Sequence, residues 1–143
     1  MGVPITHRSV SQYSSFVRCV EAYRLEKVAR APQNQAAWFI QGTAYHEAVE
    51  KWEKSRRSCG PDQMAEWFED AWEREYAAAL AVEPDVSRWL TGGIVRPEND
   101  VKKRRERGRE QVEAYFEYAI EAPERIWEPV EGQPAIELPF TLD

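Results

Sequence analysis

A glycine, a histidine and a glutamate recur at intervals of four residues in the segment GTAYHEAVE, residues 42–50. If this segment is helical, Gly42, His46 and Glu50 stack one turn above another along a single ridge. An imidazole and a carboxylate placed in this way can bind a metal ion or transfer protons, so His46 and Glu50 are candidate catalytic residues. A glycine inside a helix costs about 1 kcal/mol relative to alanine, which indicates that something close to Gly42 needs the space.

The position of this ridge depends on which face of the helix is buried. The predicted inward stripe has Tyr45 at its centre, and steps of about 100° per residue then place the ridge about 60° to 140° away. The ridge is therefore expected to start at the border of the buried face and to drift outward. The same spacing also suits an ordinary histidine bonded to a backbone carbonyl and a solvated glutamate in an i,i+4 contact. The predicted stripe consists of Trp38, Gln41, Tyr45, Val49 and Trp52, with Ala48 at its edge.

The elements that must position the ridge are predicted to be helices. The first is capped by Ser9 or Ser11 and ends before Pro32, and the ridge lies on a second helix over about residues 36–55. A third helix is capped by Asp62, and a fourth runs from Pro97 to about Glu121. The third helix has the clearest apolar stripe, formed by Met64, Trp67, Phe68, Ala71 and Trp72.

Residues 123–143 have a different character, because Pro123, Pro129, Pro134 and Pro139 exclude another helix. Two short extended segments are predicted there, as a hairpin around Glu131 and Gly132. The fold class is therefore mainly α with a short C-terminal β-hairpin. A single domain is expected over residues 1–143, with a helical part at 1–122 and the first strands of a further core at 123–143.

Composition narrows the class of protein. The chain has 143 residues, 43% hydrophobic and 31% charged, with a net charge of -6, which argues against coating nucleic acid by bulk electrostatics. Cys19 and Cys59 match no zinc-ligand spacing, and a reduced cytoplasmic protein is the simplest interpretation. No apolar run approaches the roughly 20 residues that span a bilayer, so no membrane partner is expected.

Two segments together resemble a known family. SVSQYSSFVRCVEAYRLEKV followed by AAWFIQGTAYHEAVEKWE is similar to the N-terminal part of the RecB-like, CRISPR-adaptation-type exonuclease branch of the PD-(D/E)XK nucleases, in its actinobacterial or phage-like forms. RWLTGG and AIELPFTLD look like the same branch, and the resemblance covers almost the whole chain. It implies the helical N-terminal part of a restriction-endonuclease-like α/β core.

The resemblance implies metal-dependent hydrolysis of DNA in recombination, repair or phage DNA processing. In the family the helix histidine is a ligand of Mg²⁺ or Mn²⁺, beside an Asp on one strand and an E-x-K pair on the next, which makes His46 the metal ligand here. Glu50 and Gly42 would be its supporting acid and its spacing residue. The family also makes a helicase or recombination partner plausible.

This sequence departs from the family pattern at its end. Asp143 comes too early and lacks the G-x-[IV]-D context, so the Asp, Glu and Lys of the family have no counterparts. The chain by itself is therefore predicted to be inactive, as the N-terminal part of a nuclease. A non-catalytic helical binding module, or a degenerate relative of the nucleases, is the alternative.

Two single residues carry weaker predictions. Some relatives hold an iron–sulfur cluster whose first cysteine lies near the position of Cys19, although Val20 replaces the usual proline. A buried structural cysteine on a helix is the plain alternative for Cys19. Glu137 is a second-shell candidate on the first predicted strand, and a solvent-facing strand residue is the equal alternative.

Two basic runs are candidate DNA contacts. The first comprises Lys51, Lys54, Arg56 and Arg57. For both runs the alternative is a solvated helix face that contacts no DNA. The second run, called the α-helical basic run below, consists of Lys102, Lys103, Arg104, Arg105, Arg107 and Arg109.

Overall fold

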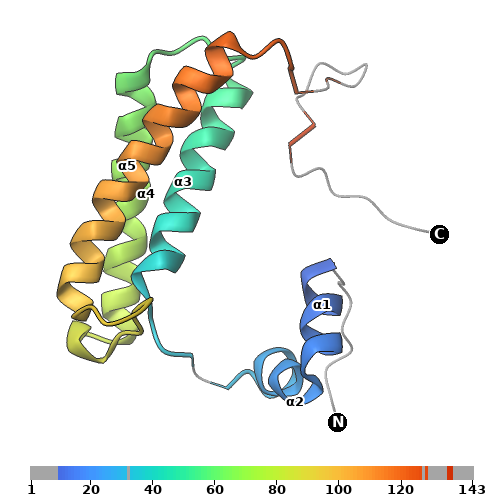
Figure 1. Cartoon of the computed structure of the whole chain (residues 1–143), viewed down its shortest axis with the longest axis vertical. Helices are drawn as coiled ribbons and strands as arrows, with labels where there is room; N and C mark the ends of the chain where they lie inside the picture. The colour runs from blue at the N-terminus through green and yellow to red at the C-terminus, as the bar shows by residue number, and fades with distance from the viewer. Residues whose placement is uncertain (1–9, 32, 127, 129–134, 137–143) are drawn as a thin grey trace. The chain divides into compact units, whose positions relative to one another are not determined.

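The computed structural model describes residues 10–31, 33–126, 128, 135 and 136. It divides into two compact units, residues 1–33 and 34–143. The described part is mainly α-helical, as predicted (Figure 1). The first unit contains α1 (Val10–Arg18), α2 (Val20–Tyr23) and the π-helix η1 (Arg24–Val28). The second contains α3 (Ala37–Lys54), α4 (Pro61–Val82), the 3-10 turn η2 (Val86–Arg88) and α5 (Pro97–Glu121).

The second unit is a bundle of three long helices that lie side by side (Figure 1). α3 and α5 run in the same direction, because Gln41 near the start of α3 donates to Gln111 at 2.6 Å and Arg57 just beyond its end donates to the carbonyl of Ala119 at 2.5 Å. α4 runs in the opposite direction between them in the sequence. Its position is fixed by apolar packing against both neighbours.

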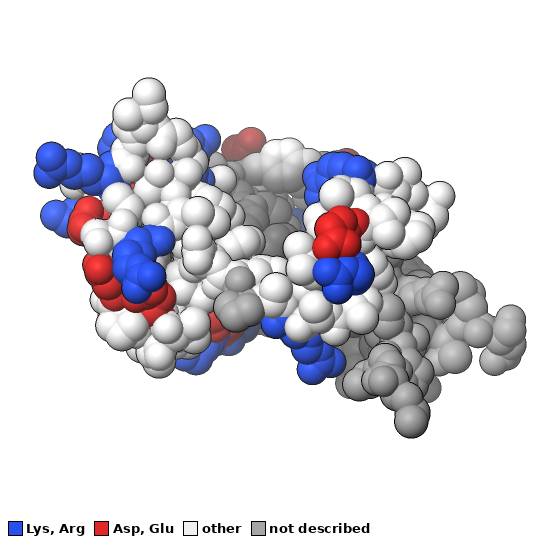
Figure 2. Space-filling view, turned by 90° about the horizontal axis from the view of Figure 1, so that it is seen from below, with Lys and Arg blue, Asp and Glu red and all other residues white. Residues whose placement is uncertain are grey.

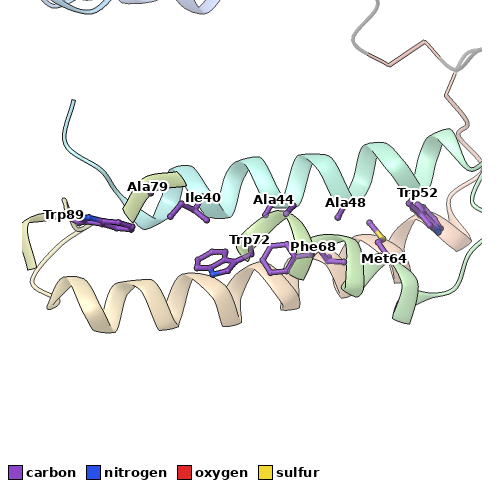
Figure 3. Close-up of a cluster of buried hydrophobic side chains, with 12 residues drawn as sticks. Ile40, Ala44, Ala48, Trp52, Met64, Phe68, Trp72, Ala79 and Trp89 are labelled. Carbon is purple, nitrogen blue, oxygen red and sulfur yellow. The ribbon is translucent and has the colours of Figure 1, made fainter. Parts of the chain in front are cut away.

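Small residues on α3 form the centre of the bundle interface. Ala44 and Ala48 are completely buried and lie opposite the aromatic rings of α4 (Figure 3). Phe68 and Trp72 fill the space that these alanines leave, with ring centroids 6.0 Å apart. The largest fully buried side chains are Trp52, Trp72, Phe68 and Met64.

The predicted inward face of α3 is therefore wrong in its centre. Tyr45 and Val49 are only half-buried on the flank of the helix, and the buried stripe instead follows Ala44 and Ala48. Alanine permits a close approach of helix axes, so the rings of α4 reach the α3 backbone there. The aromatic residues beside the alanines pack at the seam, where Tyr45 contacts Tyr115 with centroids 6.3 Å apart.

Gly108 is buried on α5 and lies directly against the Phe68 ring of α4. A Cβ atom on Gly108 would lie 2.6 Å from Cε2 of Phe68 and closer still to Cζ. Real Cβ atoms essentially never approach another heavy atom so closely. Gly108, which interrupts the basic run in the sequence, is thus the residue that lets the two helices touch.

The boundaries of the second and fourth predicted helices are confirmed to within a few residues, whereas the first predicted helix is broken at Cys19 into α1, α2 and η1. The ridge helix, expected at about 36–55, is α3, and Pro97 opens α5 as its first residue. The prediction that Asp62 caps α4 is wrong. Gly60 is the N-cap, Pro61 is the first helical residue and Asp62 lies in the first turn. Ser11 lies inside α1 and so is not its cap, and Ser9 is outside the described residues.

The two predicted extended segments fall largely outside the described residues, including the turn at 131–132 and Glu137. The described residues at 123–126, 128, 135 and 136 carry no helix and no strand. Among all described residues, the β-type pairing is one isolated parallel bridge between Ala36 and Leu90. The hairpin and the single-domain boundary stay predictions.

In the first unit no side chain of α1, α2 or η1 is buried. Phe16 of α1 packs edge-on against Tyr23 at the end of α2, with centroids 5.5 Å apart. Cys19 separates the two helices and is the N-cap of α2, where its sulfur accepts from the backbone N–H of Ala22 at 3.4 Å. Cys19 is exposed, so the alternative of a buried structural cysteine is wrong.

Candidate functional site

The ridge of Gly42, His46 and Glu50 lies on the outward face of α3. His46 is two residues from each of the buried alanines, Ala44 and Ala48, which puts it about 160° around the helix from both. Its side chain is accordingly exposed, whereas Gly42 and Glu50 are half-buried. The middle of the ridge is therefore exposed, while its two ends are partly covered.

Each ridge residue has a defined environment. The imidazole of His46 lies edge-on to the ring of Tyr45, with centroids 5.7 Å apart. Glu50 pairs with Lys54 four residues on, which is the ordinary i,i+4 contact given as the alternative. A Cβ on Gly42 would meet no atom within 4 Å, so nothing in the described part of the chain needs the space that Gly42 leaves.

The described residues do not assemble a complete metal site. Within them, no group of three or more His, Cys, Asp or Glu side chains could hold a metal ion. His46 offers an accessible imidazole and Glu50 a carboxylate that a surface lysine neutralises. One turn of helix therefore supplies at most part of a ligand set, which suits a divalent ion that takes its remaining ligands from other segments.

The α-helical basic run is divided by its contacts. Arg105 pairs with Glu69 and Glu73 of α4, both at 2.5 Å, and Arg109 also pairs with Glu69. Burial raises the pKa of Glu69, but hydrogen bonds from Arg109 and Arg105 outweigh this effect and leave the pKa lowered. Two of the six basic residues thus hold α5 against α4.

Arg104 is also engaged, on the side of α5 that faces α3. It pairs with Asp100 at 3.3 Å and donates to Gln41 at 3.4 Å. Asp100 and Gln41 are both buried, and one carboxylate oxygen of Asp100 has no partner within the described residues. The exposed members of the run that have no ion pair to a described residue are Lys102, Lys103 and Arg107.

Acidic side chains stand beside the basic ones on the surface. On the face drawn in Figure 2, acidic groups lie next to basic ones. On this face the basic groups are therefore local and are interrupted by acidic ones, as a net charge of -6 leads one to expect.

A buried polar cluster that the sequence did not predict joins the ends of α3 and α5. Glu53 is 6% exposed, accepts from the guanidinium of Arg57 at 3.0 Å and accepts from the hydroxyl of Tyr115 at 2.8 Å. Burial and the bond to Glu53 raise the pKa of Tyr115 to about 12. The sequence feature that could have indicated this cluster is Glu53, a glutamate directly after Trp52 of the predicted buried stripe.

The described residues contain no helix long and apolar enough to cross a membrane.

Comparison with known protein families assigns the chain to a superfamily. The model of the PD-(D/E)XK nuclease superfamily matches residues 7–140. The chain belongs to this superfamily.

Two phage proteins are similar to this nuclease-superfamily chain. The Gene 69 protein of Mycobacterium phage D29 is 34% identical over 139 residues, which is 95% of this chain and 52% of the relative. The Gene 69 protein of Mycobacterium phage L5 is 29% identical over 158 residues, which is 95% of this chain and 54% of the relative. The chain thus spans about half the length of these curated relatives. No solved structure matches it.

Nucleases of this superfamily generally use divalent metal ions such as Mg²⁺ or Mn²⁺. An imidazole and a carboxylate on the outward face of α3 fit such an ion in donor chemistry, because hard divalent cations prefer oxygen and Mn²⁺ also accepts nitrogen.

Proposed function

We propose that this chain contributes the histidine ligand of a metal-dependent deoxyribonuclease of the RecB-like, CRISPR-adaptation-type branch. The family match over residues 7–140 carries the proposal. The exposed position of His46 supports it, because a ligand on the outward face of α3 is accessible to segments outside the three-helix bundle. Exonuclease action in DNA recombination, repair or phage DNA processing belongs to the same proposal.

In this proposal each residue of the ridge has one role. His46 binds the metal ion through a ring nitrogen, and the ion supplies charge that stabilises the scissile phosphate and lowers the pKa of the attacking water. Glu50 is the supporting acid one turn further along α3. Its carboxylate pairs with Lys54 and can accept a hydrogen bond from metal-bound water.

The remaining assignments follow from the same branch. Lys102, Lys103 and Arg107 are proposed to contact backbone phosphates of DNA, since their charges are not neutralised within the described part. Cys19 is exposed and so accessible to an iron–sulfur cluster, and Glu137 stays a second-shell candidate. A helicase or recombination partner is proposed by family analogy alone.

The decisive experiment compares His46→Ala with the unaltered full-length protein in Mn²⁺-dependent degradation of DNA. Loss of a direct metal ligand is expected to lower activity by at least about 100-fold. The melting temperature should be unchanged, because the side chain is exposed and makes only an edge contact with Tyr45. Thr43→Ala, an exposed change on the same helix, is the control. Full activity of His46→Ala would refute the role of the histidine.

A competing function is a non-catalytic helical module that binds DNA or a protein partner. It is favoured by the absence of a three-ligand cluster within the described residues. The two functions separate in how His46→Ala affects cleavage and binding of DNA. If the chain is part of a nuclease, this change abolishes Mn²⁺-dependent cleavage and leaves DNA binding intact, whereas a binding module shows no metal-dependent cleavage with or without the change.

A further inference from the structure

Three arginines converge where α3 ends and the chain leaves α5. The pocket between them has a volume of about 290 Å³ and is lined by Glu53, Arg56, Arg57, Arg125, Ile126 and Glu128. We call it the arginine pocket. It lies on the same end of the bundle as the connection between α3 and α4, and on a different part of the chain from the ridge of His46.

The backbone places two of these arginines in an uncommon conformation. Arg56 has a φ of 57° and Arg57 a φ of 59°, both in the left-handed region that favours glycine. Holding residues with side chains in this region costs roughly 1–2 kcal/mol each. The turn lets Arg57 fold back beneath the helix end, and it leaves Arg56 on the outside of the pocket, where its side chain is 64% exposed.

Arg57 is fully engaged in the fold. Its guanidinium binds Glu53 and the carbonyl of Ala119 and lies 5.3 Å from the centre of the Trp52 ring. The Arg57 and Glu53 side chains are 13% and 5% exposed, so this pair is buried and its charges cancel. Arg57 therefore forms the floor of the pocket and gives it no net charge.

The outer part of the pocket has an excess of positive charge. Arg56 pairs with Glu128 at 3.2 Å, and both side chains are exposed. Arg125 donates from Nη1 to the backbone carbonyls of Ala122 and Glu124, at 2.5 and 2.9 Å, which holds its guanidinium over the end of α5. Arg125 makes no ion pair with a described residue, so among the described side chains at the rim two arginines accompany one glutamate.

We propose that the arginine pocket binds one backbone phosphate of a nucleic-acid strand. Two guanidinium groups at its rim can each donate two N–H groups to phosphate oxygens in a planar fork. Glu128 occupies this position in the free protein and is displaced by the phosphate, since an exposed ion pair contributes only about 0–1 kcal/mol. The proposal rests on the proposed function, in which the strand is the substrate.

The test is binding of a short fluorescent oligothymidylate to the full-length protein in EDTA, where no metal-dependent cleavage occurs. Arg125→Ala and Arg56→Ala are each expected to weaken binding by up to about fivefold at low salt. Each should also reduce the slope of log affinity against log salt by about 1. Arg74→Ala is the matched control, because Arg74 is an exposed arginine paired with Glu47 on another part of the bundle.

Glu128→Gln should change the affinity for the oligonucleotide in the opposite direction. Removing the carboxylate that competes with phosphate should tighten binding, whereas Glu117→Gln, an exposed change of the same charge on α5, should alter it much less. Inorganic phosphate should compete with the oligonucleotide less well in Arg125→Ala than in the unaltered protein. The proposal is overturned if the pocket variants bind as Arg74→Ala does, or if Glu128→Gln and Glu117→Gln are equal.

These outcomes are independent of the metal site. His46→Ala should bind the oligonucleotide normally in EDTA even though it is expected to lose cleavage. Normal binding by the arginine variants together with an inactive His46→Ala would reject the pocket and keep the nuclease. Weakened binding by the arginine variants together with a fully active His46→Ala would support the arginine pocket and refute the role of the histidine.

Discussion

Replacing Gly108 by alanine should destabilise the protein, although glycine-to-alanine changes inside helices usually stabilise. The gain in helix propensity is about 1 kcal/mol. Against it stands the contact with Phe68, whose Cε2 would lie 2.6 Å from the new Cβ. The Phe68 ring is completely buried and packs on Trp72, so it cannot move away without disturbing the core. Overpacking of this kind costs about 1–3 kcal/mol, and a net loss of up to about 2 kcal/mol is expected.

The matched control is Gly42→Ala, in the other helical glycine of the bundle. A Cβ there meets no atom within 4 Å, so the same substitution should raise the free energy of unfolding by up to about 1 kcal/mol. The assay is urea unfolding of the full-length protein, with midpoint and slope compared for the two variants. Equal stabilisation of both variants would refute the close approach of α4 and α5.

A rescue experiment identifies the cause. Phe68→Leu removes the ring atoms that the new Cβ would meet, so it should cost less in the Gly108→Ala protein than in the unaltered one. The coupling energy between the two sites should be about 0.5–3 kcal/mol. Additive effects would show that Gly108→Ala acts through something other than the Phe68 ring.

Two further predictions concern the polar contacts of α5. The pKa of Tyr115, raised from 10.0 to about 12, means that the stability from its neutral hydroxyl is complete below pH 10 and is lost as the pH rises through 12. Tyr115→Phe should therefore lower the free energy of unfolding by about 1 kcal/mol at neutral pH. Chemical unfolding of this variant should show a smaller fall in stability between pH 10 and pH 12 than the unaltered protein, and an equal fall would contradict the prediction. In the basic run, Lys102→Ala, Lys103→Ala and Arg107→Ala should weaken DNA binding with little change in melting temperature. Arg105→Ala should instead lower the melting temperature, because Arg105 binds Glu69 and Glu73 of α4, and the reverse ranking would refute this division of the run.

The sequence by itself determined where the helices lie and what family they belong to. Apolar residues at helical spacing, together with Pro97 at the start of a helix, predict α3 and α5 to within a few residues. The GxxxHxxxE spacing and the segment before it indicated the nuclease superfamily, which the match over residues 7–140 confirms. These features are local, since periodicity and capping depend on residues only a few positions apart.

Only the tertiary structure decided which face of each helix is buried and what its glycines do. On α3, an aromatic stripe at Tyr45 and a small-residue stripe at Ala44 adjoin, and hydrophobicity alone favoured the aromatic one. The rings of Phe68 and Trp72 select the alanines, because large side chains on one helix pack best against small ones on its neighbour.

Helix packing also explains why the two glycines differ in their surroundings and why only some residues of the basic run form ion pairs. Gly42 and Gly108 look alike in the sequence, yet only Gly108 faces a ring of another helix. Arg105 and Lys103 are equivalent by composition, yet Glu69 of α4 lies within reach of Arg105. Such partners come from elements tens of residues away, and their identity depends on how the helices pack. Gly42, His46 and Glu50 lie on one helix as the spacing predicted, and packing leaves His46 exposed while Gly42 and Glu50 are half-buried.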